Sequence, residues 1–144
     1  MAEMTKIWYF LPMHRIVFIV YPGFELLDVA GPSSVFNNAN RAREMRDEPQ
    51  FYRLDLASAG GEVTSSSGIT VETHAIASLA CEDIHTVLVA GAERQPLLRA
   101  MADPEIRAAL PVMVGKASRF GSVCTGAFIL AALGLLDGCR VATH

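Results

Sequence analysis

The stretch that decides the fold reads Phe120-Gly121-Ser122-Val123-Cys124-Thr125-Gly126-Ala127-Phe128-Ile129-Leu130. A short apolar strand ends at Cys124, a turn of small residues follows, and an almost wholly apolar helix begins. This order predicts a sharp strand-to-helix corner that presents one thiol, the cysteine counterpart of the serine nucleophile elbow. The N–H groups and dipole of the helix N-terminus favour the thiolate. The alternative is a buried structural cysteine, because free cysteines are often buried.

Segments on either side of this corner alternate between strand and helix patterns. A continuous run of β-branched and aromatic residues at 16–20 predicts a buried central strand, and the alternating pattern at 54–57 predicts a strand with one wetter face. We also expect parallel strands at residues 86–89 and 120–123, and a small β-excursion around residues 62–71. Strands that alternate with helices predict an α/β fold, with a three-layer, mostly parallel sheet and helices on both faces.

The helix boundaries follow from proline, glycine and capping signals. Residues 24–30 predict a short helix with Leu26, Leu27 and Ala30 on one face, and Pro32 is expected to open a second helical piece that carries Val35 inward. Asp103 followed by a proline and a glutamate predicts a helix start. The apolar residues 127–136 predict a core helix.

Composition narrows the class of protein. The chain has 144 residues, of which 51% are hydrophobic and 19% charged, so one domain with a sizeable core is expected. The net charge of −3 argues against a nucleic-acid-binding surface in this chain. No uncharged apolar stretch of 18 residues or more occurs in the sequence, so no membrane span is predicted.

The three cysteines are Cys81, Cys124 and Cys139, without a CxxC spacing. This odd count predicts neither a disulfide framework nor a metal site, and it fits a reducing cytoplasm. We interpret Cys81 and Cys139 as packing residues, and we expect no cofactor.

The last residues, 140–144, predict the start of another strand. A doubly wound sheet does not usually stop at that point, so we expect the domain to be truncated at its C-terminal side. The expected organisation is an N-terminal extension over residues 1–14 and an incomplete domain over residues 15–144.

Four segments of the chain resemble the ThiJ/PfpI-type domain, which has a flavodoxin-like, class I glutamine amidotransferase-like fold. They are residues 21–32, 57–61, 65–70 and 122–144, and the last, SVCTGAFILAALGLLDGCRVATH, is the most specific. Within that family the N-terminal domain of AraC-family transcriptional regulators is most similar. The resemblance extends from residue 15 to the end and covers roughly three quarters of such a domain.

The resemblance implies a site. Cys124 matches the nucleophile, and Asp28 matches an acid hydrogen-bonded to that thiol in relatives. The backbone N–H groups of Ala92 and Thr125 match an oxyanion pocket, with Gly91 beside them. The alternatives are that Asp28 is a solvated surface acid, that Thr125 only starts a helix and that Gly91 only makes a turn.

Gly126, which follows Thr125, is the remaining candidate ligand-binding residue. The chain also departs from the family pattern at positions of this site. Many relatives carry glycine at the position of Ala92, so the pocket is expected to be tighter. The peptidase-like branch has histidine where Thr125 stands, which argues against a Cys-His dyad. His144 matches a histidine near the site in many relatives, but we do not assign it as a base.

The resemblance implies three functions, in decreasing order of expectation. The first is a small-molecule-sensing and dimerisation domain of a cytoplasmic AraC-type regulator, which would reach DNA only through a missing C-terminal helix-turn-helix domain. The second is an isocyanide hydratase-like enzyme with Cys124 as nucleophile and Asp28 managing protons. The third is oxidation sensing or glyoxalase-like chemistry at Cys124.

Overall fold

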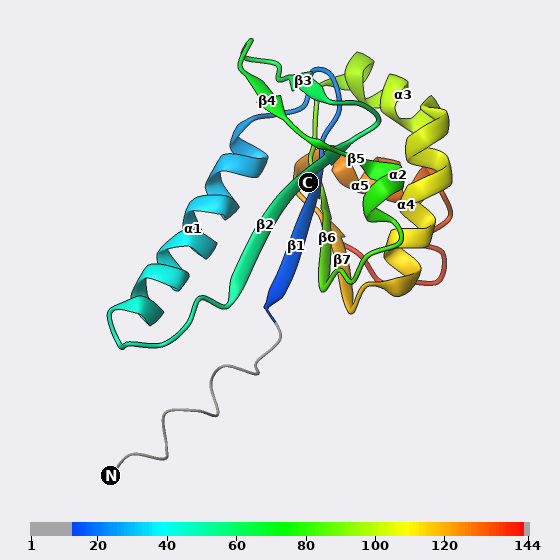
Figure 1. The fold of residues 1–144 in the computed structure, drawn as a ribbon. Helices are drawn as coiled ribbons and strands as arrows, with labels where there is room; N and C mark the ends of the chain where they lie inside the picture. Colours follow the sequence, from blue (N-terminus) through cyan, green and yellow to red (C-terminus); the bar gives the residue numbers. More distant parts are fainter. Residues whose placement is uncertain (1–12, 143–144) are drawn as a thin grey trace.

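Five parallel strands form the central sheet of the computed structural model, which describes residues 13–142 (Figure 1). The order across the sheet is β5-β2-β1-β6-β7. The bounds are β1 His14–Ile19, β2 Tyr52–Ser58, β5 His74–Ala75, β6 Thr86–Val89 and β7 Arg119–Ser122. All neighbouring pairs in this sheet run parallel, so the carboxyl ends of the strands lie at one edge.

The centre of the core is β1. Val17, Phe18 and Ile19 are each 0% exposed, because helices cover both faces of this strand. A continuous apolar run is what such a position requires. The predicted parallel sheet is confirmed, with the predicted strands matching β1, β2, β6 and β7 to within two residues at each end.

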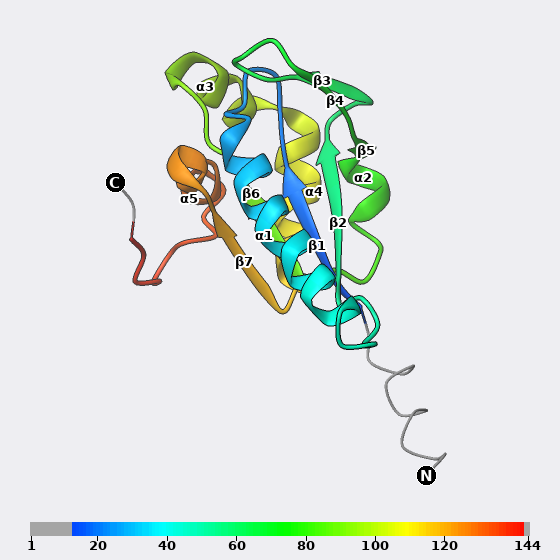
Figure 2. The same cartoon turned by 90° about the vertical axis from the view of Figure 1, so that its left-hand side faces the viewer.

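Helices lie on both sides of the sheet, which makes three layers (Figures 1 and 2). The long α1, Leu27–Glu44, lies on one side, and α2, Ile76–Leu79, and α4, Pro104–Lys116, lie on the other. The remaining helical elements are α3 Arg94–Ala102, η2 Cys124–Gly126 and α5 Ala127–Ala132. The small β-excursion is an antiparallel pair, β3 Glu62–Thr64 with β4 Thr70–Glu72.

The predicted break at Pro32 is wrong, because α1 is one continuous helix through that residue. Pro32 is the sixth residue of α1, so its missing N–H costs one hydrogen bond close to the helix start, where its fixed φ fits the helix. Val35 on this continuous helix is 67% exposed, against the prediction that it points inward, and Leu27 is 70% exposed.

The C-terminal part departs from prediction in its length. Here α5 ends at Ala132 and Gly134 takes a positive φ of 72°, so the expected helix over 127–136 is too long. Residues 140–142 form no strand, and the rest of that predicted strand, with His144, lies outside the described residues. Cys81 and Cys139 are exposed, which overturns their interpretation as packing residues.

The capping prediction at Asp103 is confirmed. Its side chain accepts hydrogen bonds from the N–H groups of Glu105 and Ile106 at the start of α4. In the part of the chain that the structure describes, no helix is long and apolar enough to cross a membrane.

Candidate functional site

Cys124 stands on a sharp corner between β7 and α5. Val123 is still extended, and its N–H donates to the Val89 carbonyl over 2.9 Å, so the preceding chain remains tied to the sheet. Cys124 then takes a φ of 51°, in the left-handed region that L-residues with a side chain rarely adopt. This conformation makes the sharp strand-to-helix turn at Cys124. Cys124 is exposed, which excludes the alternative of a buried structural cysteine.

Gly126 brings this corner into contact with the end of β6. A Cβ atom at Gly126 would lie 2.3 Å from the Val89 carbonyl oxygen and 2.9 Å from that of Ala90. No side chain fits at that distance from backbone atoms. The absence of a side chain at Gly126 thus fixes how closely η2 approaches the sheet, and it sets the position of Cys124 relative to β6.

Asp28 reaches the same place from the first turn of α1. It is buried, with 9% exposed, and its Oδ2 atom accepts a 2.8 Å hydrogen bond from the Gly91 N–H. This burial argues against the alternative of a solvated surface acid. A Cβ atom at Gly91 would lie 2.8 Å from Asp28 Oδ2, from Cys124 Cβ and from the Thr125 nitrogen. The Gly91 backbone therefore lies among three other candidate residues, Asp28, Cys124 and Thr125.

The Thr125 side chain makes two hydrogen bonds to the backbone of Ala92. The Ala92 N–H donates to Thr125 Oγ1 over 2.9 Å, and the same hydroxyl donates to the Ala92 carbonyl over 2.8 Å. We call this pair the Thr125 clamp. Thr125 thus does more than start a helix, since it ties the corner to the loop after β6. The Ala92 N–H, expected to face an oxyanion pocket, has an internal partner.

Tyr21 is the neighbour of the site that the sequence analysis missed. It is 2% exposed and its hydroxyl donates to the Ala90 carbonyl over 2.8 Å. Burial raises the pKa of Tyr21 far above its ordinary value, and the negative charges of Asp28 and Cys124 raise it further. The available signal was its position directly after the first buried strand, at the same edge as Cys124.

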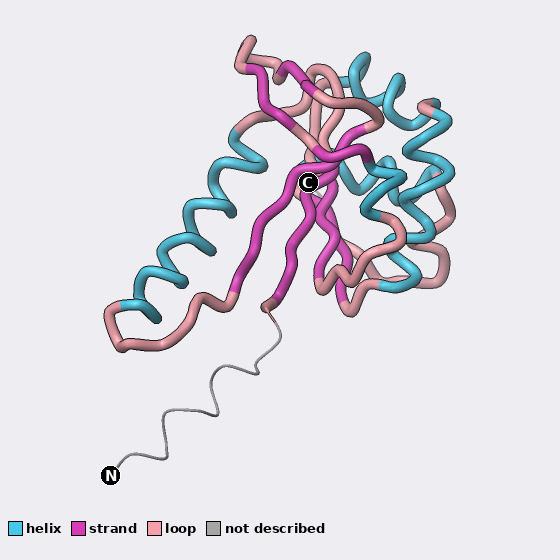
Figure 3. Tube along the Cα trace, in the orientation of Figure 1, coloured by secondary structure: helices cyan, strands magenta, loops and turns pink. Residues whose placement is uncertain are grey.

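The arrangement is open to small molecules but carries no metal cluster. Loops that leave the carboxyl ends of β1 and β6 gather at one end of the sheet, where ligands of open α/β sheets bind (Figure 3). Within residues 13–142, no group of three or more His, Cys, Asp or Glu side chains is placed to hold a metal ion. What the site offers chemically is an exposed thiol, a buried carboxylate and backbone amides.

The sequence model of the DJ-1/PfpI family matches residues 14–144, and the chain therefore belongs to that family. The chain is 41% identical over 134 residues to a Streptomyces lividans protein named "Uncharacterized protein in cpoL 5'region", covering 91% of this chain and 87% of that one. It is 32% identical over 133 residues to the HTH-type transcriptional regulator GlxA of Rhizobium meliloti (strain 1021), covering 92% of this chain and 39% of GlxA.

Solved structures agree with this assignment. A THiJ/PfpI family protein from Pseudomonas syringae matches with a TM-score of 0.74 and 25% identity, over 96% of this chain and 52% of that one. An AraC family transcriptional regulator from Pseudomonas putida has the same fold, with a TM-score of 0.68 and 24% identity, over 91% of this chain and 66% of that one. The chain thus spans about half of the first structure and 39% of GlxA.

Proposed function

We propose that this chain is the ligand-sensing domain of a transcriptional regulator and that it binds a small molecule beside Cys124. The observation that carries the proposal is the match to GlxA, which is 32% identical over 92% of this chain while the match covers only 39% of GlxA. Most of GlxA lies outside the matched region, which leaves room for a separate DNA-binding domain in a regulator of that kind. Contact with DNA would then be made outside residues 14–144.

The hydrogen bonds at the site support binding rather than turnover. An oxyanion hole needs N–H donors aimed at the developing charge. The Ala92 N–H instead donates to Thr125, while Asp28 Oδ2 accepts a hydrogen bond from the Gly91 N–H. Both groups hold the backbone in place. The residue after Cys124 is threonine, so no adjacent histidine is available as a base.

A cysteine enzyme is the second candidate, and the exposed Cys124 with its φ of 51° favours it. In that case the thiolate would attack an electrophilic carbon such as that of an isocyanide. A C–S bond would form as one C–N π bond breaks, with its electron pair moving to nitrogen, and Asp28 would relay a proton to the carbon. Water would then attack that carbon and release the Cys124 thiolate, with a formamide as product.

The two candidates are separated by a turnover assay. The wild-type chain, Cys124→Ser and the control Cys139→Ser, which changes another exposed cysteine, are incubated with isocyanides, methylglyoxal and simple amides. We expect no turnover that depends on Cys124. Turnover at about 1 per second or faster that is lost in Cys124→Ser and kept in Cys139→Ser would replace the sensor with the enzyme.

The proposed domain also assembles as a homodimer. In the described sheet β7 pairs only with β6, and an edge strand with free backbone groups recruits partners. Phe120 on β7 is 38% exposed and Phe128 on α5 is 48% exposed. Sedimentation velocity tests this: a dimer that Phe120→Glu converts to monomer supports it, and a wild-type monomer at all concentrations contradicts it.

A further inference from the structure

A cavity of about 380 Å³ lies directly beside the Thr125 clamp. Ala92 and Thr125 form part of its wall, so the cavity begins one residue away from Cys124. Its volume falls within the range of small-molecule sites, roughly 300–1,000 Å³. A molecule bound there would contact the same hydroxyl that holds the corner of Cys124 in place.

Most of the wall of this cavity is apolar. Leu97, Leu98 and Met101 come from α3, and Phe128 faces the cavity from α5. Leu98 is 45% exposed and Phe128 is 48% exposed, so both side chains present large apolar surface to water. Such surface around a cavity favours an apolar ligand, because its burial stabilises the complex.

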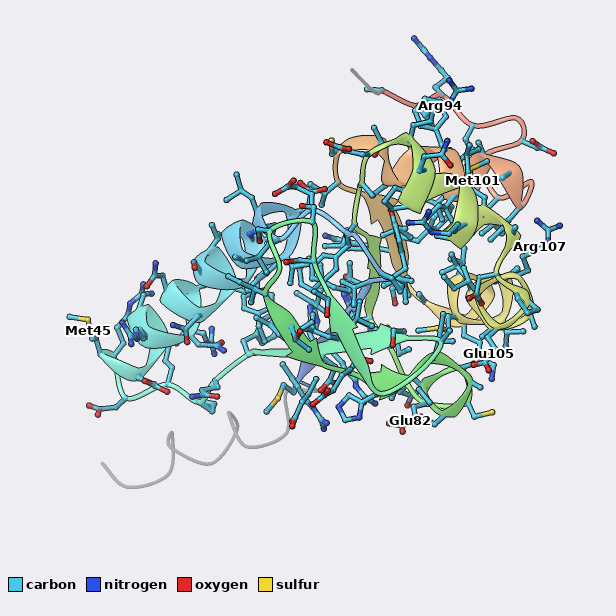
Figure 4. All side chains as sticks on the ribbon, turned by 90° about the horizontal axis from the view of Figure 1, so that it is seen from above. Met45, Glu82, Arg94, Met101, Glu105 and Arg107 are labelled. Carbon is cyan, nitrogen blue, oxygen red and sulfur yellow. The ribbon has the colours of Figure 1, made fainter. Side chains whose placement is uncertain are left out.

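One charged residue, Arg94, lines the cavity together with these apolar side chains. Arg94 is the first residue of α3 and is exposed (Figure 4). Among residues 13–142, the Arg94 guanidinium forms no ion pair with a carboxylate. A guanidinium at the rim of an apolar cavity is suited to a carboxylate, which it binds through two parallel hydrogen bonds.

We propose that this cavity binds a small apolar carboxylate, with its hydrocarbon part against Leu98 and Phe128 and its carboxylate at Arg94. This inference rests on the proposed ligand-sensing function and names the chemical class of that ligand. A bound molecule of this class would contact the Thr125 clamp, so ligand binding would change the surroundings of the adjacent Cys124.

The test is calorimetric titration of the chain with octanoate and with 1-octanol, which differ in charge but share the apolar tail. Wild-type protein is expected to bind octanoate more tightly than 1-octanol. Arg94→Gln should weaken octanoate about fivefold and leave 1-octanol unchanged, since the lost contact is one partly exposed ion pair. Arg99→Gln is the matched control, because Arg99 lies on the same helix and does not line the cavity.

A second variant tests the apolar wall. Phe128→Ser, at a half-exposed position, should weaken both ligands about tenfold, with the fold checked by circular dichroism. The proposal is overturned if neither ligand binds wild-type protein at low millimolar concentration, or if Arg94→Gln binds octanoate as wild type does. These outcomes are independent of the turnover assay, because neither variant alters Cys124 or Asp28.

Discussion

The two ends of the central strands are built from different interactions. At the carboxyl end, polar side chains bond to backbone: Asp28 accepts from Gly91, and Tyr21 donates to Ala90. Near the amino end of β1, an ion-pair network joins side chains: Arg15 Nε lies 2.6 Å from Asp55 Oδ2, and Arg15 also pairs with Glu82. The first arrangement fixes the backbone precisely, whereas the second supplies stability that responds to pH.

The two ends also differ in their ring contacts and in how closely backbone segments approach each other. The amino end stacks the His14 ring on His85, with ring centroids 3.7 Å apart. Burial lowers the pKa of His14, and the charges of His85 and Arg119 lower it further. The carboxyl end instead brings backbone within van der Waals contact through Gly91 and Gly126. We therefore expect steric changes to disrupt the carboxyl end and pH changes to act on the amino end.

The largest expected effect is that of Gly126→Ala. Its new Cβ would lie 2.3 Å from the Val89 carbonyl oxygen, a backbone atom that cannot move without shifting β6. We expect a loss of about 3–4 kcal/mol in the free energy of unfolding, measured by urea denaturation. Gly115→Ala is the control, because that helical position has nothing within 4 Å of the new atom. It should stabilise by about 0.5–1 kcal/mol. Equal stability of the two variants would contradict the close contact between Gly126 and the end of β6.

The second largest expected effect is a pH-dependent loss in the free energy of unfolding in Asp55→Asn. Burial alone would raise the pKa of Asp55, but the hydrogen bond and charge of Arg15, with help from Arg53, lower it below the usual 3.8. A lowered folded-state pKa gives stability that is present at neutral pH and is lost as pH falls through that pKa.

Urea denaturation at two pH values tests this. At pH 7, Asp55→Asn should cost about 2 kcal/mol, because it leaves Arg15, whose side chain is 11% exposed, with only Glu82 as a partner. As the pH falls through the lowered pKa of Asp55, the wild-type carboxyl is protonated too and the difference should shrink toward zero. Asp137→Asn, at an exposed loop position, should show no comparable loss. A difference that does not change with pH would mean that Asp55 acts through packing alone.

The smallest effect is that of Tyr21→Phe. It removes the hydrogen bond to the Ala90 carbonyl and should cost about 1 kcal/mol at pH 7. Because the folded-state pKa of Tyr21 is raised, the stability gained from its neutral form is complete below pH ~10 and is lost above it, where the unfolded chain ionises. The wild-type advantage should therefore shrink in alkaline buffer. If the wild-type advantage instead grew in alkaline buffer, folding would lower the pKa of Tyr21 rather than raise it.

The fold could be predicted from sequence because β1 and β6 carry apolar runs and strand patterns alternate with helix patterns along the chain. The course of α1 could not, since Gly31 and Pro32 are local signals for a break and the position of Pro32 near the helix start makes it tolerable. The corner at Cys124 was visible because small residues follow an apolar strand. In contrast, the partner of Tyr21 lies 69 residues away and that of Thr125 lies 33 away, so strand register decides both contacts.

The candidate site depended on the family resemblance for Asp28. An acid on an amphipathic helix gives no local sign of burial, and its contact with Gly91 joins residues 63 positions apart. The expected use of the Ala92 N–H also came from the resemblance. The structure places that group against the Thr125 hydroxyl, a contact that follows from threonine rather than histidine after the cysteine.

The central claim is that the corner makes Cys124 chemically distinct, and the relative rate of thiol labelling tests it most directly. All three cysteines are exposed, so simple accessibility does not separate them. With a limiting amount of iodoacetamide at pH 7, peptide mass spectrometry should find Cys124 modified at least about tenfold faster than Cys81 or Cys139, because its corner, with a φ of 51°, presents the thiol outward at the edge of the sheet. Equal rates at the three positions would contradict the account.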